Sequence, residues 1–114
     1  MNLTLELLDT FIRREEAFLP KFAPGTSQHS LLVNRIAAFY TVRDLLTGEG
    51  EPSKEELEFA MPRIRSIFRK MSKARDKYEP GSRNYQRFDP TVKAMGEAEA
   101  LLELAWSTKE DVTK

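Results

Sequence analysis

A short turn motif occurs twice in this chain, and its two copies lie 56 residues apart. Residues 24–26 read Pro-Gly-Thr and residues 80–82 read Pro-Gly-Ser. Each copy places a glycine, which readily takes the left-handed conformation that ends a helix, before a hydroxyl residue that can cap the next helix. The motif therefore predicts two helical hairpins with equivalent turns.

The similarity between the two halves extends well beyond the turns. Residues 5–46 align with residues 61–102 without a gap, and seven of the 42 aligned positions are identical. Because one helical hairpin cannot bury its apolar face alone, two copies are expected to pack face to face. The sequence thus predicts an all-α fold, a four-helix bundle built from two duplicated hairpins related by a pseudo-two-fold axis.

Apolar residues recur at helical spacing through four segments, and sustained two-residue alternation typical of strands is missing. The predicted helices are residues 3–22, 27–47, 54–78 and 83–106. Ser53 and Glu56 form a predicted capping box at the start of the third helix. We expect a single domain over 1–114, with a first repeat at about 3–47, a linker at 48–53, a second repeat at about 54–106 and a frayed tail at 107–114.

Two prolines fall inside the predicted helices of the second repeat. Pro62 lies in the third helix and Pro90 in the fourth, and proline lacks the amide hydrogen that a helix interior requires. We expect each to kink its helix or restart it, with Asp89 capping a restart at Pro90. The second repeat is therefore predicted to be the distorted copy.

Composition and residue spacing argue against several classes of protein. The chain has no cysteine and one histidine, so it offers no thiol nucleophile and neither the HExxH nor the di-iron ExxH pattern. The carboxylates of residues 55–58 fit a helix start, where acidic groups favour the helix dipole. No apolar run approaches the ~20 residues of a membrane helix, and residues 1–8 lack a basic signal-peptide start. We expect no enzymatic activity, no metal and no cofactor.

The predicted helix at 27–47 is apolar over more than half of its circumference, which indicates that it is covered on more than one side. It is either the central helix or part of a homodimer or higher homo-oligomer that buries some of Leu31, Ala38, Tyr40 or Leu45. Two arginines lie within this apolar arc. Arg43 aligns with Glu99 and is expected to pair with it, whereas Arg35 aligns with Thr91 and has no predicted mate.

Charge is unevenly distributed although the net charge is zero. Residues 62–87 carry nine Lys or Arg and two Asp or Glu, while residues 1–61 and 88–114 are net acidic. One interpretation is a solvated helix face balanced by acidic neighbours. The other is an anion site, because like charges held close together repel one another unless an anion lies among them.

Helix starts bind anions through free amides, and both turns carry suitable side chains beside such a start. The predicted ligand-binding residues are Thr26, Ser27, Gln28, His29 and Arg35 at the first turn, and Ser82, Arg83, Asn84, Tyr85 and Arg87 at the second. His29 and Tyr85 could stack on a base, or else pack over their turns. No standard phosphate-binding loop is present.

In size, helical character and duplicated hairpin, the chain resembles small accessory proteins of phages and mobile elements. Some of these sequester nucleotide immune messengers in sites lined by arginine and helix ends. Small helical bacteriocin-immunity proteins resemble it in the same way. The resemblance implies an anti-defence role in the cytoplasm of a bacterial or phage-infected cell.

Three hypotheses for function follow. The first is non-enzymatic binding, and possible sequestration, of a small anionic, nucleotide-like ligand at the two turns. The second is an inhibitor or immunity-type module whose basic third helix contacts an acidic protein partner. Nucleic-acid binding ranks third, because acidic segments flank the basic block and would repel a long phosphate backbone.

Overall fold

The structure, a computed structural model, describes residues 2–112 and is entirely helical there. Its elements are α1 (Leu3–Phe18), the short 3-10 helix η1 (Leu19–Lys21), α2 (Ser27–Thr47), α3 (Lys54–Asp76) and α4 (Arg83–Val112). The described residues contain no strand. The all-α prediction is confirmed, and the packing of the helices is consistent with a bundle.

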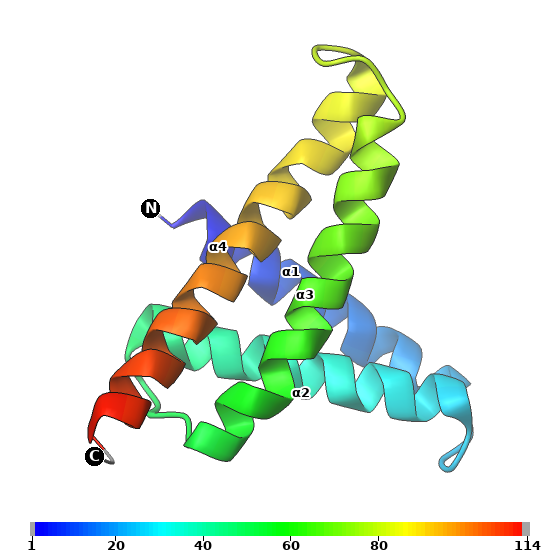
Figure 1. The fold of residues 1–114 in the computed structure, drawn as a ribbon. Helices are drawn as coiled ribbons and strands as arrows, with labels where there is room; N and C mark the ends of the chain where they lie inside the picture. The colour runs from blue at the N-terminus through cyan, green and yellow to red at the C-terminus, as the bar shows by residue number, and fades with distance from the viewer. Residues whose placement is uncertain (1, 113–114) are drawn as a thin grey trace.

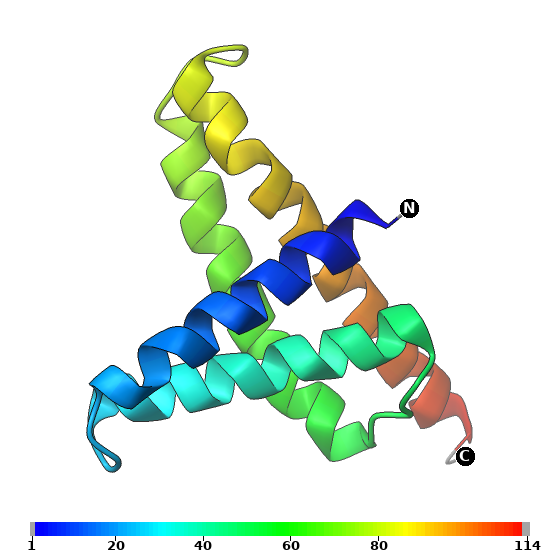
Figure 2. The same ribbon diagram turned by 180° about the vertical axis from the view of Figure 1, so that it is seen from behind.

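The four α-helices form two hairpins that cross one another (Figure 1). Within the hairpins α1 packs on α2 and α3 on α4, while α2 contacts α3 and α1 contacts α4 across the crossing. The two hairpin turns project at different corners of the molecule (Figure 2). The radius of gyration of 15.0 Å exceeds the value of about 13 Å for a compact domain of this length, which reflects these projecting turns.

The core lies where the hairpins cross, near the ends opposite their turns. All four helices contribute fully or nearly fully buried apolar side chains to it, namely Leu8, Ile12, Ala38, Phe39, Val42, Leu57, Ala60, Ile64, Ala94, Met95, Ala98 and Leu102. Four of these residues are alanines, whose small side chains let helices approach closely. The crossing is therefore the densely packed part of the molecule, and the hairpin turns extend away from it.

The two turns have the same backbone and capping geometry. Gly25 and Gly81 have φ angles of 92° and 90°, in the left-handed region that favours glycine. Thr26 Oγ1 accepts a hydrogen bond from the His29 amide, and Ser82 Oγ accepts one from the Tyr85 amide, both at 3.2 Å. The predicted hydroxyl caps are confirmed at both turns. The predicted glycine stops are wrong, because η1 ends at Lys21 and α3 at Asp76, and both glycines lie in the turn beyond the helix end.

The predicted capping box at the start of α3 is also present. The Glu56 amide donates to Ser53 Oγ at 3.1 Å, and the Ser53 amide donates to Glu56 Oε1 at 2.9 Å.

Gly48, with φ of 73°, ends α2. Leu104 occupies the aligned position in α4, and the helix continues to Val112. The predicted helix end at residue 106 is wrong by six residues. The frayed tail at 107–114 stays a prediction, and residues 113–114 lie outside the described residues.

Both α3 and α4 run through their prolines without interruption, so the predicted restart at Pro90 is wrong. Asp89 caps nothing, because Arg75 and Lys93 bind its carboxylate instead. Beside Pro62, the Arg63 guanidinium lies 3.6 Å from the centre of the Phe59 ring and donates to the Phe59 carbonyl oxygen at 2.8 Å. This side-chain bond supplements helix hydrogen bonding in the turn where proline lacks a donor.

The wide apolar arc of α2 is explained by its contacts with α1, α3 and α4. Ala38 is completely buried in the core of its own chain, so it cannot contribute to a homo-oligomer interface as expected. Leu31 and Tyr40 remain exposed, at 54% and 42%. Homo-oligomer formation through these two residues stays a prediction.

The turn glycines generate a stability prediction. Gly25→Ala and Gly81→Ala should each lower the free energy of unfolding by about 1–2 kcal/mol, because a side chain strains the left-handed backbone. An added Cβ would meet no atom within 4 Å at either site, so the effect should come from the backbone alone. Urea denaturation measures both changes.

Glu79→Ala is the matched control, since Glu79 is exposed and lies two residues before Gly81. It should change stability by less than about 0.5 kcal/mol. An alanine at either glycine position that costs no more than this control would contradict the assigned turn geometry.

Candidate functional site

Charged pairs join the two helices within each hairpin. In the first, Arg43 Nε donates to Asp9 Oδ1 at 2.9 Å, and in the second, Arg65 Nε donates to Glu99 Oε1 at 2.8 Å. The hydrogen bonds that these carboxylates accept raise the pKa of both arginines. The predicted Arg43–Glu99 pair is therefore wrong, since each residue finds its partner on the antiparallel neighbour in its own hairpin.

Arg35 also has an ion-pair partner, although the alignment of the two repeats predicted none for it. Its Nη1 atom donates to Glu15 Oε1 at 2.8 Å, and the Glu15 side chain is only 16% exposed. This pair joins α2 to α1. The contact holds the Arg35 guanidinium in place at the edge of the surface that faces α3.

A second partnered arginine lies near the α3–α4 turn. Arg75 donates to Asp89 Oδ1 at 2.8 Å and to Asp76 Oδ1 at 3.0 Å, and its guanidinium lies 5.1 Å from the centre of the Tyr85 ring. Hydrogen bonds from Lys93 and Arg75 hold the pKa of the Asp89 carboxyl below its ordinary value. These contacts tie the outer part of α4 to α3.

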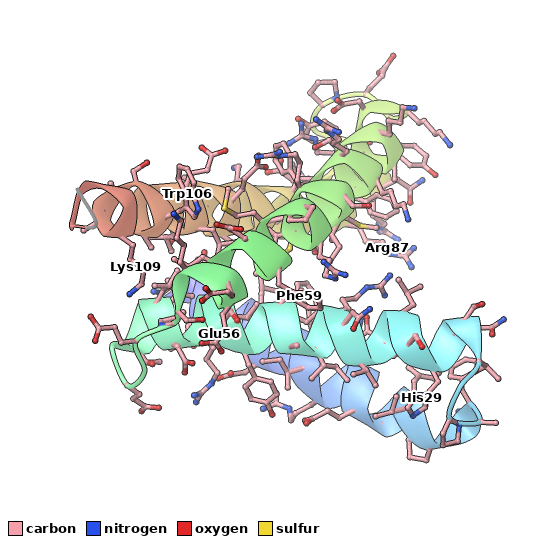
Figure 3. The ribbon with its side chains drawn as sticks, turned by 60° about the horizontal axis from the view of Figure 1, so that its bottom comes forward. His29, Glu56, Phe59, Arg87, Trp106 and Lys109 are labelled. Carbon is pink, nitrogen blue, oxygen red and sulfur yellow. The ribbon has the colours of Figure 1, made fainter. Side chains whose placement is uncertain are left out.

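The residues predicted at the first turn lie together at one corner of the molecule. Ser27 and Gln28 are exposed, and His29, partly buried, lies at the outer end of α2 (Figure 3). The Thr26 hydroxyl is engaged internally, because it also donates to the Ala23 carbonyl oxygen at 2.7 Å. Arg35 lies further along α2, away from this corner.

The residues predicted at the second turn lie at the other projecting corner. Arg83, Asn84 and Arg87 are exposed and form no ion pair within residues 2–112, whereas Tyr85 packs beneath Arg75. The ten predicted residues are thus distributed over two separate turns and the middle of α2. The structure does not bring them together into one site.

A groove of about 340 Å³ lies between α2 and α3, so each hairpin contributes one of its walls. Its lining residues are Leu31, Asn34, Arg35, Pro62, Arg63, Ser66, Ile67 and Lys70. Of these, only Arg35 was predicted as a site residue. The lining residues from α3 share one face of that helix, as their spacing in the sequence shows. Their position opposite Arg35 depends on how the two hairpins cross.

The chemistry of this groove is that of an anion site with an apolar wall. Arg35, Arg63 and Lys70 supply positive charge, and Asn34 and Ser66 supply neutral hydrogen-bond donors. The rest of the lining is apolar, and no carboxylate is among the lining residues. Arg35 is oriented by Glu15 and Arg63 by Phe59, so two of the three cations are held before any ligand arrives.

A broader hollow of about 1160 Å³ lies along α3 and shares Pro62, Ser66 and Lys70 with the groove. The lining of this hollow is completed by Arg65, Phe68, Arg69, Ser72, Lys73, Ala74, Asp76 and Lys77. The Ser72 hydroxyl oxygen is buried without a hydrogen-bond partner in the described structure. Five of its eleven lining residues are Lys or Arg, one is a carboxylate, and the rest are apolar or serine.

Within the described part of the chain, no three His, Asp or Glu side chains are grouped so that they could hold a metal ion. None of the helices described here combines the length and apolar character needed to cross a membrane. No protein-family model, curated protein or solved structure matches the chain.

The Arg35–Glu15 pair yields a stability prediction. Arg35→Ala leaves a mostly buried Glu15 carboxylate without its charged donor, so the free energy of unfolding should fall by about 1.5–3 kcal/mol. Arg87→Ala is the control and should be neutral within about 0.5 kcal/mol, because its guanidinium is exposed. Equal effects of the two changes in urea denaturation would contradict the structural role of Arg35.

Asp89 yields a pH prediction. Because its folded-state pKa lies below the ordinary value of 3.8, the ionised carboxylate stabilises the fold above that pH, and this stabilisation disappears as pH falls through the folded pKa. The stability difference between the parent and Asp89→Asn should be largest above about pH 5 and shrink towards about pH 3. Urea denaturation at several pH values measures it, with Glu79→Gln as the control. A difference that grows on acidification would contradict the assignment.

Proposed function

We propose that this protein is a non-enzymatic binder of a small anionic ligand, held in the groove between α2 and α3. The observation that supports this most directly is the lining of the groove. Cations from both hairpins, Arg35 on one side with Arg63 and Lys70 on the other, meet across it without a lining carboxylate. An anion in the groove would neutralise Arg63 and Lys70, which form no ion pair within residues 2–112, while Arg35, already bound to Glu15, would add hydrogen-bond donors.

The size and composition of the groove favour a nucleotide-like ligand. Its volume of about 340 Å³ lies within the range of roughly 300–1,000 Å³ that is typical of small-molecule sites. The apolar surface of Leu31, Pro62 and Ile67 can pack against a base, while the cations bind phosphate. Sequestration of such a ligand in a bacterial or phage-infected cell is the corresponding biological role.

We also propose that the two hairpins arose by internal duplication and are related by a pseudo-two-fold axis. The ion pairs support this, because Asp9–Arg43 and Arg65–Glu99 occupy aligned positions with their charges exchanged. The turns support it as well, through the matching φ angles of Gly25 and Gly81. The core adds aligned buried pairs, among them Leu8 with Ile64 and Ala38 with Ala94.

The alignment also explains why only one groove is cationic. The counterpart surface lies between α4 and α1, which are in contact. There Thr91 aligns with Arg35 and Leu7 with Arg63, so two of the three cations are missing, and only Arg14 corresponds to Lys70. After duplication, one of two equivalent surfaces would have acquired the charges needed to bind an anion.

A binding experiment tests the groove directly. The parent should show increased thermal stability with at least one of ATP, GTP, a cyclic dinucleotide or inorganic pyrophosphate, since a ligand at about 100 times its Kd adds about 2.7 kcal/mol. Lys70→Ala should weaken binding by roughly 10- to 150-fold, because a charged hydrogen bond contributes about 1.5–3 kcal/mol. Isothermal titration calorimetry measures the Kd values.

Arg14→Ala is the matched control, because Arg14 is exposed and occupies the aligned position in the first repeat. It should leave the Kd unchanged within about twofold, since it lies outside the groove. No stabilisation by any of the four probes, or equal losses in Lys70→Ala and Arg14→Ala, would contradict the proposed function.

A further inference from the structure

We propose a second binding surface, on the outer part of α3, that contacts the phosphate backbone of duplex DNA. We define the α3 stripe as Arg69 and Lys73 of α3 together with Lys77, the residue that caps its C-terminal end; the three follow one another at four-residue intervals. None of the three lines the groove between α2 and α3, whereas all three line the broader hollow on α3. The proposal is therefore independent of the proposed small-ligand site.

The α3 stripe is a row of solvent-exposed positive charge. Residues at four-residue intervals on a helix lie on one face, about 6 Å apart along its axis. No stripe residue forms an ion pair within residues 2–112. In contrast, the neighbouring Arg65 and Arg75 bind carboxylates of α4. The cations of the α3 stripe thus remain available to an external anion.

The surroundings of the α3 stripe favour phosphate over an acidic protein. Protein interfaces depend on large apolar or aromatic anchors, but none of the exposed large hydrophobic residues among the described residues falls within 62–77. The two nearest are occupied, since Arg63 covers Phe59 and Tyr78 stacks on Phe88. Phosphate contacts require only charged and hydrogen-bonding groups, which this surface supplies.

The lack of an exposed large apolar or aromatic residue within 62–77 also favours duplex DNA over a single strand. Proteins that bind single strands stack the bases on exposed aromatic side chains. The exposed aromatic beside the α3 stripe, Tyr78, already stacks on Phe88, so the stripe would contact mainly the backbone. B-form DNA presents about one charge per 1.7 Å of its axis, which suits a straight row of cations, whereas double-stranded RNA is recognised largely through its 2′-hydroxyl groups.

The crossing of the hairpins weakens the objection that acidic segments flank the basic block. The α3–α4 turn projects at one extremity, away from the α1–α2 turn (Figure 1). Of the acidic residues in the flanks, Asp9, Glu15 and Glu99 already bind arginines. Residues 62–87, with nine basic and two acidic residues, can approach a polyanion from this exposed end.

The salt dependence of binding tests the proposal. Fluorescence anisotropy with a labelled 20-base-pair duplex of mixed sequence should show binding at 50 mM NaCl. With three to four phosphates neutralised, the affinity should fall roughly 40- to 150-fold between 50 and 200 mM NaCl. Failure of the parent to bind the duplex at 50 mM NaCl would overturn the proposal.

A triple variant identifies the surface. Arg69→Gln/Lys73→Gln/Lys77→Gln should reduce the slope of log affinity against log salt by about 2.7, since each lost contact removes about 0.9. The control Arg13→Gln/Arg14→Gln/Lys21→Gln removes equal charge from the first hairpin and should keep the parent slope. Circular dichroism checks that both variants fold. A triple variant with the parent slope, or a control with an equal loss, would overturn the proposal.

Two further measurements separate the alternatives. Tighter binding of the parent to a 20-residue polyglutamate peptide than to the duplex would overturn the proposal in favour of an acidic protein partner. Tighter binding to a single strand of equal length would overturn it in favour of single-stranded nucleic acid. The triple variant should retain the parent affinity for whichever nucleotide or pyrophosphate probe binds the groove. Failure of the groove proposal therefore leaves the duplex result unaffected.

Discussion

The positions of the groove and of the two hairpin turns depend on the close packing of α2, α3 and α4 through small side chains. Ala38, Ala60, Ala94 and Ala98 are all buried in the core where the hairpins cross. Because alanine adds little bulk beyond the backbone, the helices can approach closely there, and apolar burial stabilises the contact. The crossing lays α2 against α3, which forms the groove, and it leaves both hairpin turns projecting into solvent.

The charged residues divide into two groups according to their position relative to this packing. Arg35, Arg43 and Arg65 lie between helices, and each binds a carboxylate. Lys70 and the α3 stripe lie on the outer surface of α3, where the neighbouring helix offers them no carboxylate within residues 2–112. The first group stabilises the hairpins. The second group carries the proposed DNA surface, and its Lys70 lines the proposed ligand groove together with Arg35 and Arg63.

The candidate site was only partly predictable from the sequence. Arg35 was identified from its unusual place in an apolar arc, and it does line the groove, but its partner Glu15 was missed. Arg63 and Lys70 were assigned to a basic face without a position relative to α2. The expected Arg43–Glu99 pair assumed that aligned residues meet near the pseudo-axis. Arg43 instead reaches Asp9, because antiparallel neighbours within a hairpin lie closer than residues across the crossing.

The sequence by itself determined the helices, their bounds to within a few residues over most of the chain, and the chemistry of both turns. These features depend on contacts within about one helical turn, such as the left-handed glycines and the hydroxyl caps, so local residues suffice to specify them. Only the tertiary structure decided which helices cross, which carboxylate each arginine binds, and that Arg35 faces Arg63 and Lys70. Those outcomes depend on side chains far apart in the chain, whose distances are set by the packing of the whole core.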